Sequence, residues 1–148
     1  KNFNILRVSG CGFDGLHTGF WGGLQDFLGD DKWQHTIVPF LKSSAYSAGI
    51  HATGHYLGAA MATSFSGCAN SNQNPYGFRV NYLWNYAGPG TSLEPLTNGQ
   101  ASDGSFAGAR FWVQDGWSAD PIAGLASTVG FKHERAKAVQ LSQDFCRA

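Results

Sequence analysis

The feature that most constrains the fold is a pair of glycines, Gly54 and Gly58, placed between two segments of different character. Residues 49–53 predict a short buried strand, and residues 57–63 predict the start of a helix. A strand that turns directly into a helix leaves no room for a Cβ at its flanking positions, and glycine removes that Cβ. The sequence therefore predicts a tight strand-to-helix turn centred on Tyr56.

A strand, a Gly-x-x-x-Gly turn and a helix form the nucleophile elbow of α/β-hydrolases, whose strained central residue points at the substrate. Serine would present an activatable hydroxyl there, whereas Tyr56 presents a bulky phenol on a longer arm. A phenol has an unperturbed pKa of about 10 and needs a base to become a nucleophile. We therefore interpret the turn as a degenerate elbow in which the phenol plugs a former pocket. Its residues are Gly54, His55, Tyr56, Leu57 and Gly58.

Five motifs in the same order resemble the class 3 lipase family of fungal and plant triacylglycerol lipases. Residues 53–62 are similar to the family's T-G-H-S-L-G-G-A-L-A, and residues 16–20 to its V-H-x-G-F. Residues 86–89 are similar to F-G-x-P, which ends the strand after the elbow helix. Residues 120–122 are similar to the D-P/I-V that carries the catalytic acid, and residues 130–133 to a later G-F/Y-x-H.

This resemblance spans about residues 13–135 and implies one lipase-like domain, 1–148, equivalent to the C-terminal half of the hydrolase core. The expected fold class is α/β, a truncated α/β-hydrolase-like core with a mostly parallel sheet flanked by helices. Parallel strands need cover on both faces and partners at both edges. Missing strands would leave an open apolar edge, which either another polypeptide fills or a remodelled sheet removes.

Only one catalytic group of the family has a candidate match in this chain. Asp120 is the possible vestigial acid. Asp115 is a rival, because residues 114–119 form a longer connection than the family usually has before this acid. His133 matches a non-catalytic position of the family, whose catalytic histidine lies further downstream, and the upstream oxyanion-hole pattern is missing. The resemblance therefore implies a pseudoenzyme, with no catalytic residue expected.

The remaining histidines have structural interpretations. We expect His55 to be a buried, hydrogen-bonded histidine beside the elbow, His17 to be a structural hydrogen-bonder, and His51 to point away from the elbow. Their spacing fits no common metal-ligand pattern, so no metal and no cofactor are expected.

The composition indicates that another molecule covers part of the surface of this domain. Charged residues make up 14% of the chain, against roughly 25% in an average soluble domain, while aromatic residues make up another 14%. Other protein chains of an assembly are the expected partners, with Trp33, Trp112 and Trp117 as candidate contacts. The alternative is an ordinary glycine-rich α/β domain that turns its aromatic residues inward. A net charge of zero and no basic patch argue against nucleic acid.

Cysteine and apolar patterning leave the compartment open. The three cysteines, Cys11, Cys68 and Cys146, allow at most one internal disulfide and leave one thiol over. No apolar run is long enough to span a bilayer, and no signal-peptide pattern is visible, so we expect a soluble domain without a transmembrane segment. A secreted or lumenal domain remains one option, as does a processed or partial chain.

Elsewhere the patterning predicts a mixture of strands and helices. Strands are expected at 3–8, 79–86 and 109–114, and helices at 20–28, 33–42 with a kink at Pro39, 57–65 and 132–146. Residues 88–104 are expected to form a long loop.

Taken together, these features predict a non-catalytic, lipase-like structural or interaction subunit of a larger protein assembly. One alternative is an active serine-type ester hydrolase that another chain completes. The other is a binding module that holds a lipid or pigment in the former lipase pocket.

Overall fold

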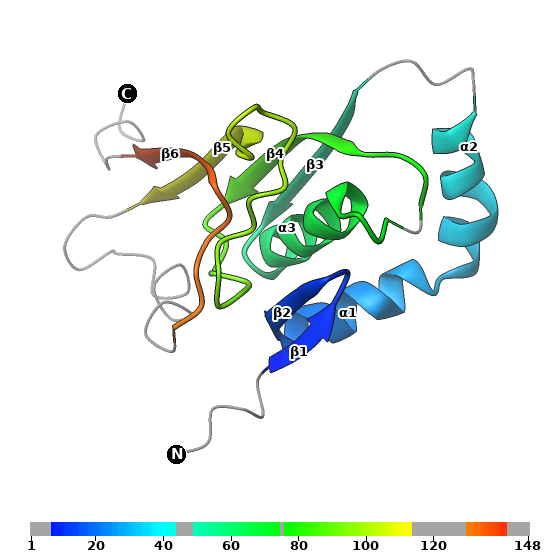
Figure 1. Ribbon diagram of the computed structural model, residues 1–148, viewed down its shortest axis with the longest axis horizontal. Helices are drawn as coiled ribbons and strands as arrows, with labels where there is room; N and C mark the ends of the chain where they lie inside the picture. The colour runs from blue at the N-terminus through cyan, green and yellow to red at the C-terminus, as the bar shows by residue number, and fades with distance from the viewer. Residues whose placement is uncertain (1–6, 44–48, 75, 114–129, 142–148) are drawn as a thin grey trace.

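The computed structural model describes residues 7–43, 49–74, 76–113 and 130–141 (Figure 1). Its centre is a sheet of four parallel strands in the order β3-β4-β5-β6. The strands are β3 (Ile50–His55), β4 (Val80–Tyr86), β5 (Phe106–Val113) and β6 (Ala136–Leu141). The expected α/β class, a parallel sheet flanked by helices, is confirmed.

A second, smaller sheet precedes the parallel one. It is an antiparallel hairpin of β1 (Arg7–Gly10) and β2 (Phe13–His17). The helices are α1 (Thr18–Leu28), a π-helical turn η2 (Trp33–Ile37), α2 (Val38–Lys42) and α3 (Leu57–Asn70). Figure 1 shows α3 lying across the sheet, with the hairpin and α1 beside it. A disulfide between Cys11 and Cys68 joins the hairpin turn to the last part of α3, so one internal disulfide forms.

Helix α3 covers one face of the sheet and supplies much of the core. Its small residues Ala59 and Ala60 are fully buried, which lets the helix axis approach the strands closely. On the covered side of β4, Leu83 is also fully buried. Trp33 enters this core from η2 with an exposed fraction of 6%.

The opposite face of the sheet has no such cover in the described part of the chain. Along β4, Tyr82 and Tyr86 are 40% and 43% exposed, although Leu83 between them is completely buried. Along β3, His51, Thr53 and His55 are exposed in the same alternation. Because parallel sheets are normally covered on both faces, this bare face is unusual.

Most of the predicted elements are confirmed, and three of them differ in their bounds or geometry. Helix α3 continues to Asn70, past its expected end at residue 65. The expected kink at Pro39 takes the form of a π-helical turn before a new helix, and Pro39 lies in the first turn of α2, where a missing N–H costs little. The strand predicted at 3–8 is described from Arg7 onward and runs to Gly10.

The predicted terminal helix at 132–146 is wrong within the described residues. Residues Ala136–Leu141 form strand β6, which pairs in parallel with β5. The backbone N–H of Phe106 donates to the carbonyl of Arg135 at 2.8 Å, so this pairing begins just before β6. Pairing with β5 outweighs local helix preference, because helix propensity is a weak local effect that tertiary contacts override.

Candidate functional site

The elbow predicted around Tyr56 is present. Tyr56 joins β3 to α3 with φ 55° and ψ −121°, a left-handed conformation that costs a non-glycine residue about 1–3 kcal/mol. Its N–H donates to the carbonyl of Tyr86 on β4 at 3.0 Å. Its own carbonyl accepts from the N–H groups of Ala59 and Ala60 at 3.0 and 3.2 Å. These bonds hold the strained turn between the sheet and the first turn of α3.

The two glycines of the elbow have different roles. A Cβ on Gly54 would overlap the carbonyl of Gly58, so the steric reason for glycine is confirmed there. A Cβ on Gly58 would meet open space, so the same expectation is wrong at that position. Gly58 therefore faces an open region beside the helix.

The side chains at the elbow are more exposed than predicted. Tyr56 is partly exposed, so its phenol does not fill a sealed pocket. His55 is exposed and packs its ring against that of Tyr56 with 4.6 Å between centroids, so the prediction of a buried His55 is wrong. Leu57, the next elbow residue, is 58% exposed. The elbow therefore presents aromatic and aliphatic surface where a hydrolase presents a hydroxyl.

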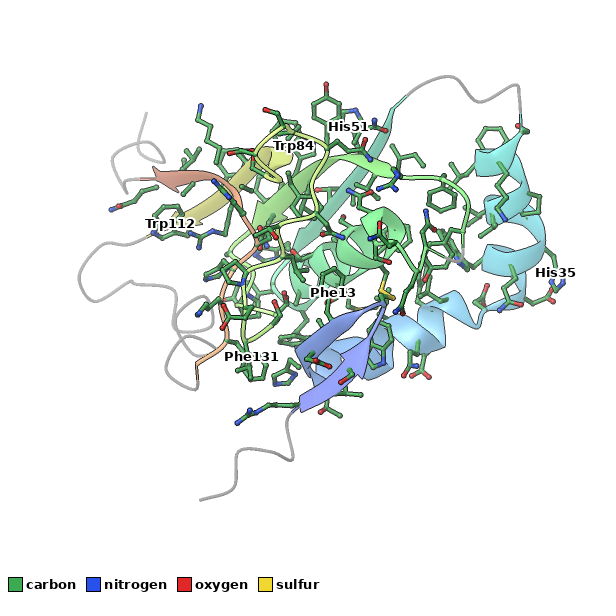
Figure 2. All side chains as sticks on the ribbon, in the orientation of Figure 1. Phe13, His35, His51, Trp84, Trp112 and Phe131 are labelled. Carbon is green, nitrogen blue, oxygen red and sulfur yellow. A yellow bond between two sulfur atoms is a disulfide. The ribbon has the colours of Figure 1, made fainter. Side chains whose placement is uncertain are left out.

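His17 and His51 have structural contacts. His17 caps α1, because its Nδ1 accepts from the N–H of Gly19 at 3.2 Å, which confirms the predicted structural role. Burial lowers the pKa of His17, with a weaker opposing effect from a backbone hydrogen bond. His51 lies on the bare face, where the Nε1 of Trp84 donates to its Nδ1 at 3.2 Å. Figure 2 shows His51 and Trp84 side by side.

The next strand also ends in a strained residue. Ala87 follows β4 with φ 51°, and its N–H donates to the carbonyl of Phe111 at 2.8 Å. Gly88 then donates its N–H to Oδ1 of Asn85 at 2.9 Å. Tyr56 and Ala87 therefore form a pair of strained turns at the carboxyl ends of adjacent strands, the edge of a parallel sheet where ligand sites usually lie.

A buried polar cluster supports these turns from the covered face. The Nδ2 of Asn85 donates to Oγ1 of Thr63 at 3.2 Å and to Oε1 of Glu134 at 3.1 Å, linking β4, α3 and the segment before β6. Burial raises the pKa of the Glu134 carboxyl, although a backbone hydrogen bond and Arg110 oppose the rise. Sequence reasoning missed this cluster; the only signal is that Glu134 directly follows the lipase-like motif ending at His133.

The predicted partner contacts differ in their exposure in the structure. Trp33 is a core residue, with its ring 4.8 Å from Phe27 and 5.5 Å from Phe65 between centroids, so it is not a surface contact as predicted. Trp112 is partly exposed, and the guanidinium of Arg110 lies 4.7 Å from the centroid of its ring. Trp117, the candidate acid Asp120 with its rival Asp115, and Cys146 lie outside the described residues.

The bare face carries aromatic residues that sequence reasoning did not select as contacts. The rings of Tyr82 and Trp84 lie nearly parallel, 6° apart in orientation and 6.4 Å between centroids. Tyr86 and Phe111 stack across β4 and β5 at 9° and 5.0 Å. His51 extends the row by stacking on Tyr82 at 4.4 Å. The strands thus present two groups of stacked rings on one face of the sheet, and their signal in the sequence is the alternation of β4.

Within the ranges that the structure describes, no three His, Cys, Asp or Glu side chains are grouped to hold a metal ion. No described helix has the length and apolar character needed to cross a bilayer. The elbow, the strained turn after β4 and the stacked rings on the bare face are the features from which a function can be argued. Neither a protein-family model nor a curated protein matches this chain.

Proposed function

We propose that this chain is a catalytically inactive, lipase-like subunit that binds another protein chain through the bare face of its parallel sheet. The observation that carries this proposal is the aromatic row on that face, defined by His51, Tyr82, Trp84, Tyr86 and Phe111. We call it the aromatic face below.

The chemistry of the aromatic face suits a protein partner. Tyrosine and tryptophan are enriched at the centres of protein interfaces, because they bury a large apolar ring and keep a polar tip. On β3 and β4 this face has no Lys, Arg, Asp or Glu; its other members, Thr53 and His55, are uncharged polar or weakly basic side chains. The stacked rings form a broad surface, which fits a second protein layer better than a small ligand.

The loss of catalysis rests on the elbow. Tyr56 occupies the position from which a hydrolase presents its nucleophile, in the strained conformation that such an elbow requires. Losing the nucleophile of a catalytic triad costs about 10⁶ in rate. We expect no turnover of short-chain p-nitrophenyl esters and no labelling by a fluorophosphonate. Tyr56→Ser should not restore either, and turnover that Tyr56→Phe abolishes would contradict the proposal.

Binding through the aromatic face is tested with the isolated chain. Its uncovered rings should bind a hydrophobic dye and cause self-association in sedimentation velocity, and the double variant Tyr82→Glu/Tyr86→Glu should lower dye binding and abolish self-association. Phe40→Glu is the matched control, because Phe40 is 58% exposed on α2, away from the sheet. A monodisperse monomer that binds no dye, or a double variant that behaves like wild type, would refute the proposed interface.

A further inference from the structure

Strand β3 has an open outer edge in the described part of the chain, since its only neighbour in the sheet is β4. The N–H of Tyr56 donates to the carbonyl of Tyr86 on β4, and the N–H of Ile50 to Oδ1 of Asn81 on the same side. Backbone groups alternate in direction along a strand. The N–H and C=O groups of residues 51, 53 and 55 therefore face away from β4, as a template for a further strand.

An apolar groove runs along this edge. It has a volume of about 380 Å³ and touches the three consecutive residues His51, Ala52 and Thr53. Ala52 points to the covered face, whereas the side chains of His51 and Thr53 point to the opposite one, so the space borders both the covered side of β3 and its backbone. Because β4 occupies the inner side of β3, this backbone contact places the groove next to the outer edge.

The floor of the groove is a stripe of α3. Gly58, Met61, Ala62 and Phe65 are spaced at i, i+3, i+4 and i+7, which places them on one side of the helix. The far wall consists of Leu24, Phe27 and Trp33. Among the described residues no charged side chain lines the groove, so its occupant must be apolar on the side that faces α3.

The two outer edges of the sheet differ in their protection. Natural sheets block exposed edges with charged residues, proline or bulges. The opposite edge strand, β6, carries the exposed Lys137. Both ladders shift register once, β3–β4 between Ile50 and His51 and β5–β6 between Phe106 and Arg110, so bulges do not distinguish the edges. Strand β3 has neither a lysine nor a proline, and its neighbouring groove is apolar. This combination favours strand addition at β3.

We propose that the groove accepts an extended segment of the partner protein, which pairs with β3 as a fifth strand of the sheet. Alternate side chains of that segment, of valine or leucine size, enter the groove against α3, and the others extend the aromatic face beyond His51 and Thr53. This is the β-strand addition mode of peptide recognition, in which backbone bonds give affinity and alternate side-chain pockets give selectivity. The inference rests on the proposed interaction function and specifies how the partner engages.

The test uses a synthetic peptide of the same length as β3, alternating valine and threonine, added to the full chain. Two N-methylated versions carry the methyl groups on alternate amides, on one edge of the peptide or on the other. Binding is followed by NMR, with hydrogen exchange of the β3 amides, and laurate serves as a competing apolar ligand without a backbone. We expect binding of the unmodified peptide, loss of binding with only one of the two methylated versions, and slower exchange at His51, Thr53 and His55.

A pair of glycine variants tests the groove itself. Gly58→Leu places a side chain in the groove without a backbone clash, since a Cβ there meets open space. Gly22→Leu is the matched control, because Gly22 is also helical, also has open space around its Cβ, and does not line the groove. We expect Gly58→Leu to weaken peptide binding by roughly tenfold or more, a change of about 1.4 kcal/mol, while Gly22→Leu leaves it unchanged.

Several results would overturn strand addition. Equal binding of all three peptides together with displacement by laurate would show a pocket for apolar ligands. Slow exchange of the outward β3 amides in the isolated chain would show that a segment of the chain itself covers the edge. The double variant Tyr82→Glu/Tyr86→Glu should keep peptide binding. Failure of the aromatic face and failure of the groove are therefore separate observations.

Discussion

The two faces of β4 are built from neighbouring residues and differ sharply in their exposure to solvent. Leu83 points at α3 and is fully buried, whereas Tyr82, one residue earlier, is 40% exposed on the aromatic face. On the covered face, side chains contact a helix that is itself anchored by a disulfide and a polar cluster. On the aromatic face, rings stack mainly on one another. Most of the stabilising contacts are thus concentrated on one side of the sheet.

The largest effect is expected from the disulfide on the covered side. Cys11 and Cys68 are separated by 57 residues, and closing a loop of that length stabilises a fold by about 4 kcal/mol in the chain-entropy description. We expect the double variant Cys11→Ser/Cys68→Ser to lose most of that free energy of unfolding, measured by urea denaturation. A reduced wild type that unfolds at the same midpoint as the oxidised protein would show that the covered side does not depend on this crosslink.

The second largest effect is expected from truncating one buried side chain on the same face. Leu83→Ala should lower the free energy of unfolding by about 3 kcal/mol, because it deletes buried methyl groups and leaves a cavity under α3. Leu83 is 0% exposed, so the site has no solvent to fill the space. Thermal or urea unfolding measures the loss. A cost below about 1 kcal/mol would mean that α3 can settle onto the sheet and that the covered face is loosely packed.

Sequence patterns predicted the elements of the sheet well but not which face would be covered. The alternation of Tyr82, Trp84 and Tyr86 with Leu83 and Asn85 correctly predicts a strand. Hydrophobic size alone would turn the three aromatic residues inward. In the structure the face containing Asn85 is the covered one, since that amide bonds Thr63 and Glu134. Such long-range partners leave no mark on local periodicity.

The candidate site was predictable where it depends on local backbone geometry. The glycine at position 54 and the strained Tyr56 follow from steric limits within a few residues, and both are found. Strand β6 was not predictable, because its partner β5 lies more than 20 residues earlier. Trp33 was misplaced for a similar reason: only the packing of η2 against α3 decides that its ring faces inward.

The buried carboxyl of Glu134 makes the stability of the covered face depend on pH. Burial raises its folded-state pKa above the ordinary value of 4.5, so the fold favours the protonated form. The contribution of Glu134 to the free energy of unfolding is fully present below the pKa of the unfolded chain. It is lost as the pH rises through the pKa of the folded protein. Glu134→Gln removes the charge and keeps an oxygen for Asn85, so it should stabilise the protein at pH 7 by about 1 kcal/mol for each unit of pKa rise removed.

Melting temperatures of wild type and Glu134→Gln between pH 4 and pH 8 check this expectation. The two curves should converge at the acidic end and separate as the pH rises, with the variant above. A variant that is less stable at pH 7 would show that the ionised carboxylate has a net favourable pairing with Arg110, the guanidinium that opposes the rise.

The smallest effect is expected one residue away from Leu83, on the aromatic face. Tyr82→Ala removes a ring that is already 40% in water and that touches mainly His51 and Trp84. Its loss should cost less than about 1 kcal/mol of unfolding free energy, in the range of cross-strand aromatic pairs. Urea denaturation beside Leu83→Ala gives the comparison directly, in the same strand and under the same conditions. Equal costs for the two variants would mean that the aromatic face contributes to the fold as much as the core does, and its rings would then be explained by stability. A cost near zero, together with reduced dye binding, would agree with the proposed partner interface, because the ring would then matter for binding and not for the fold.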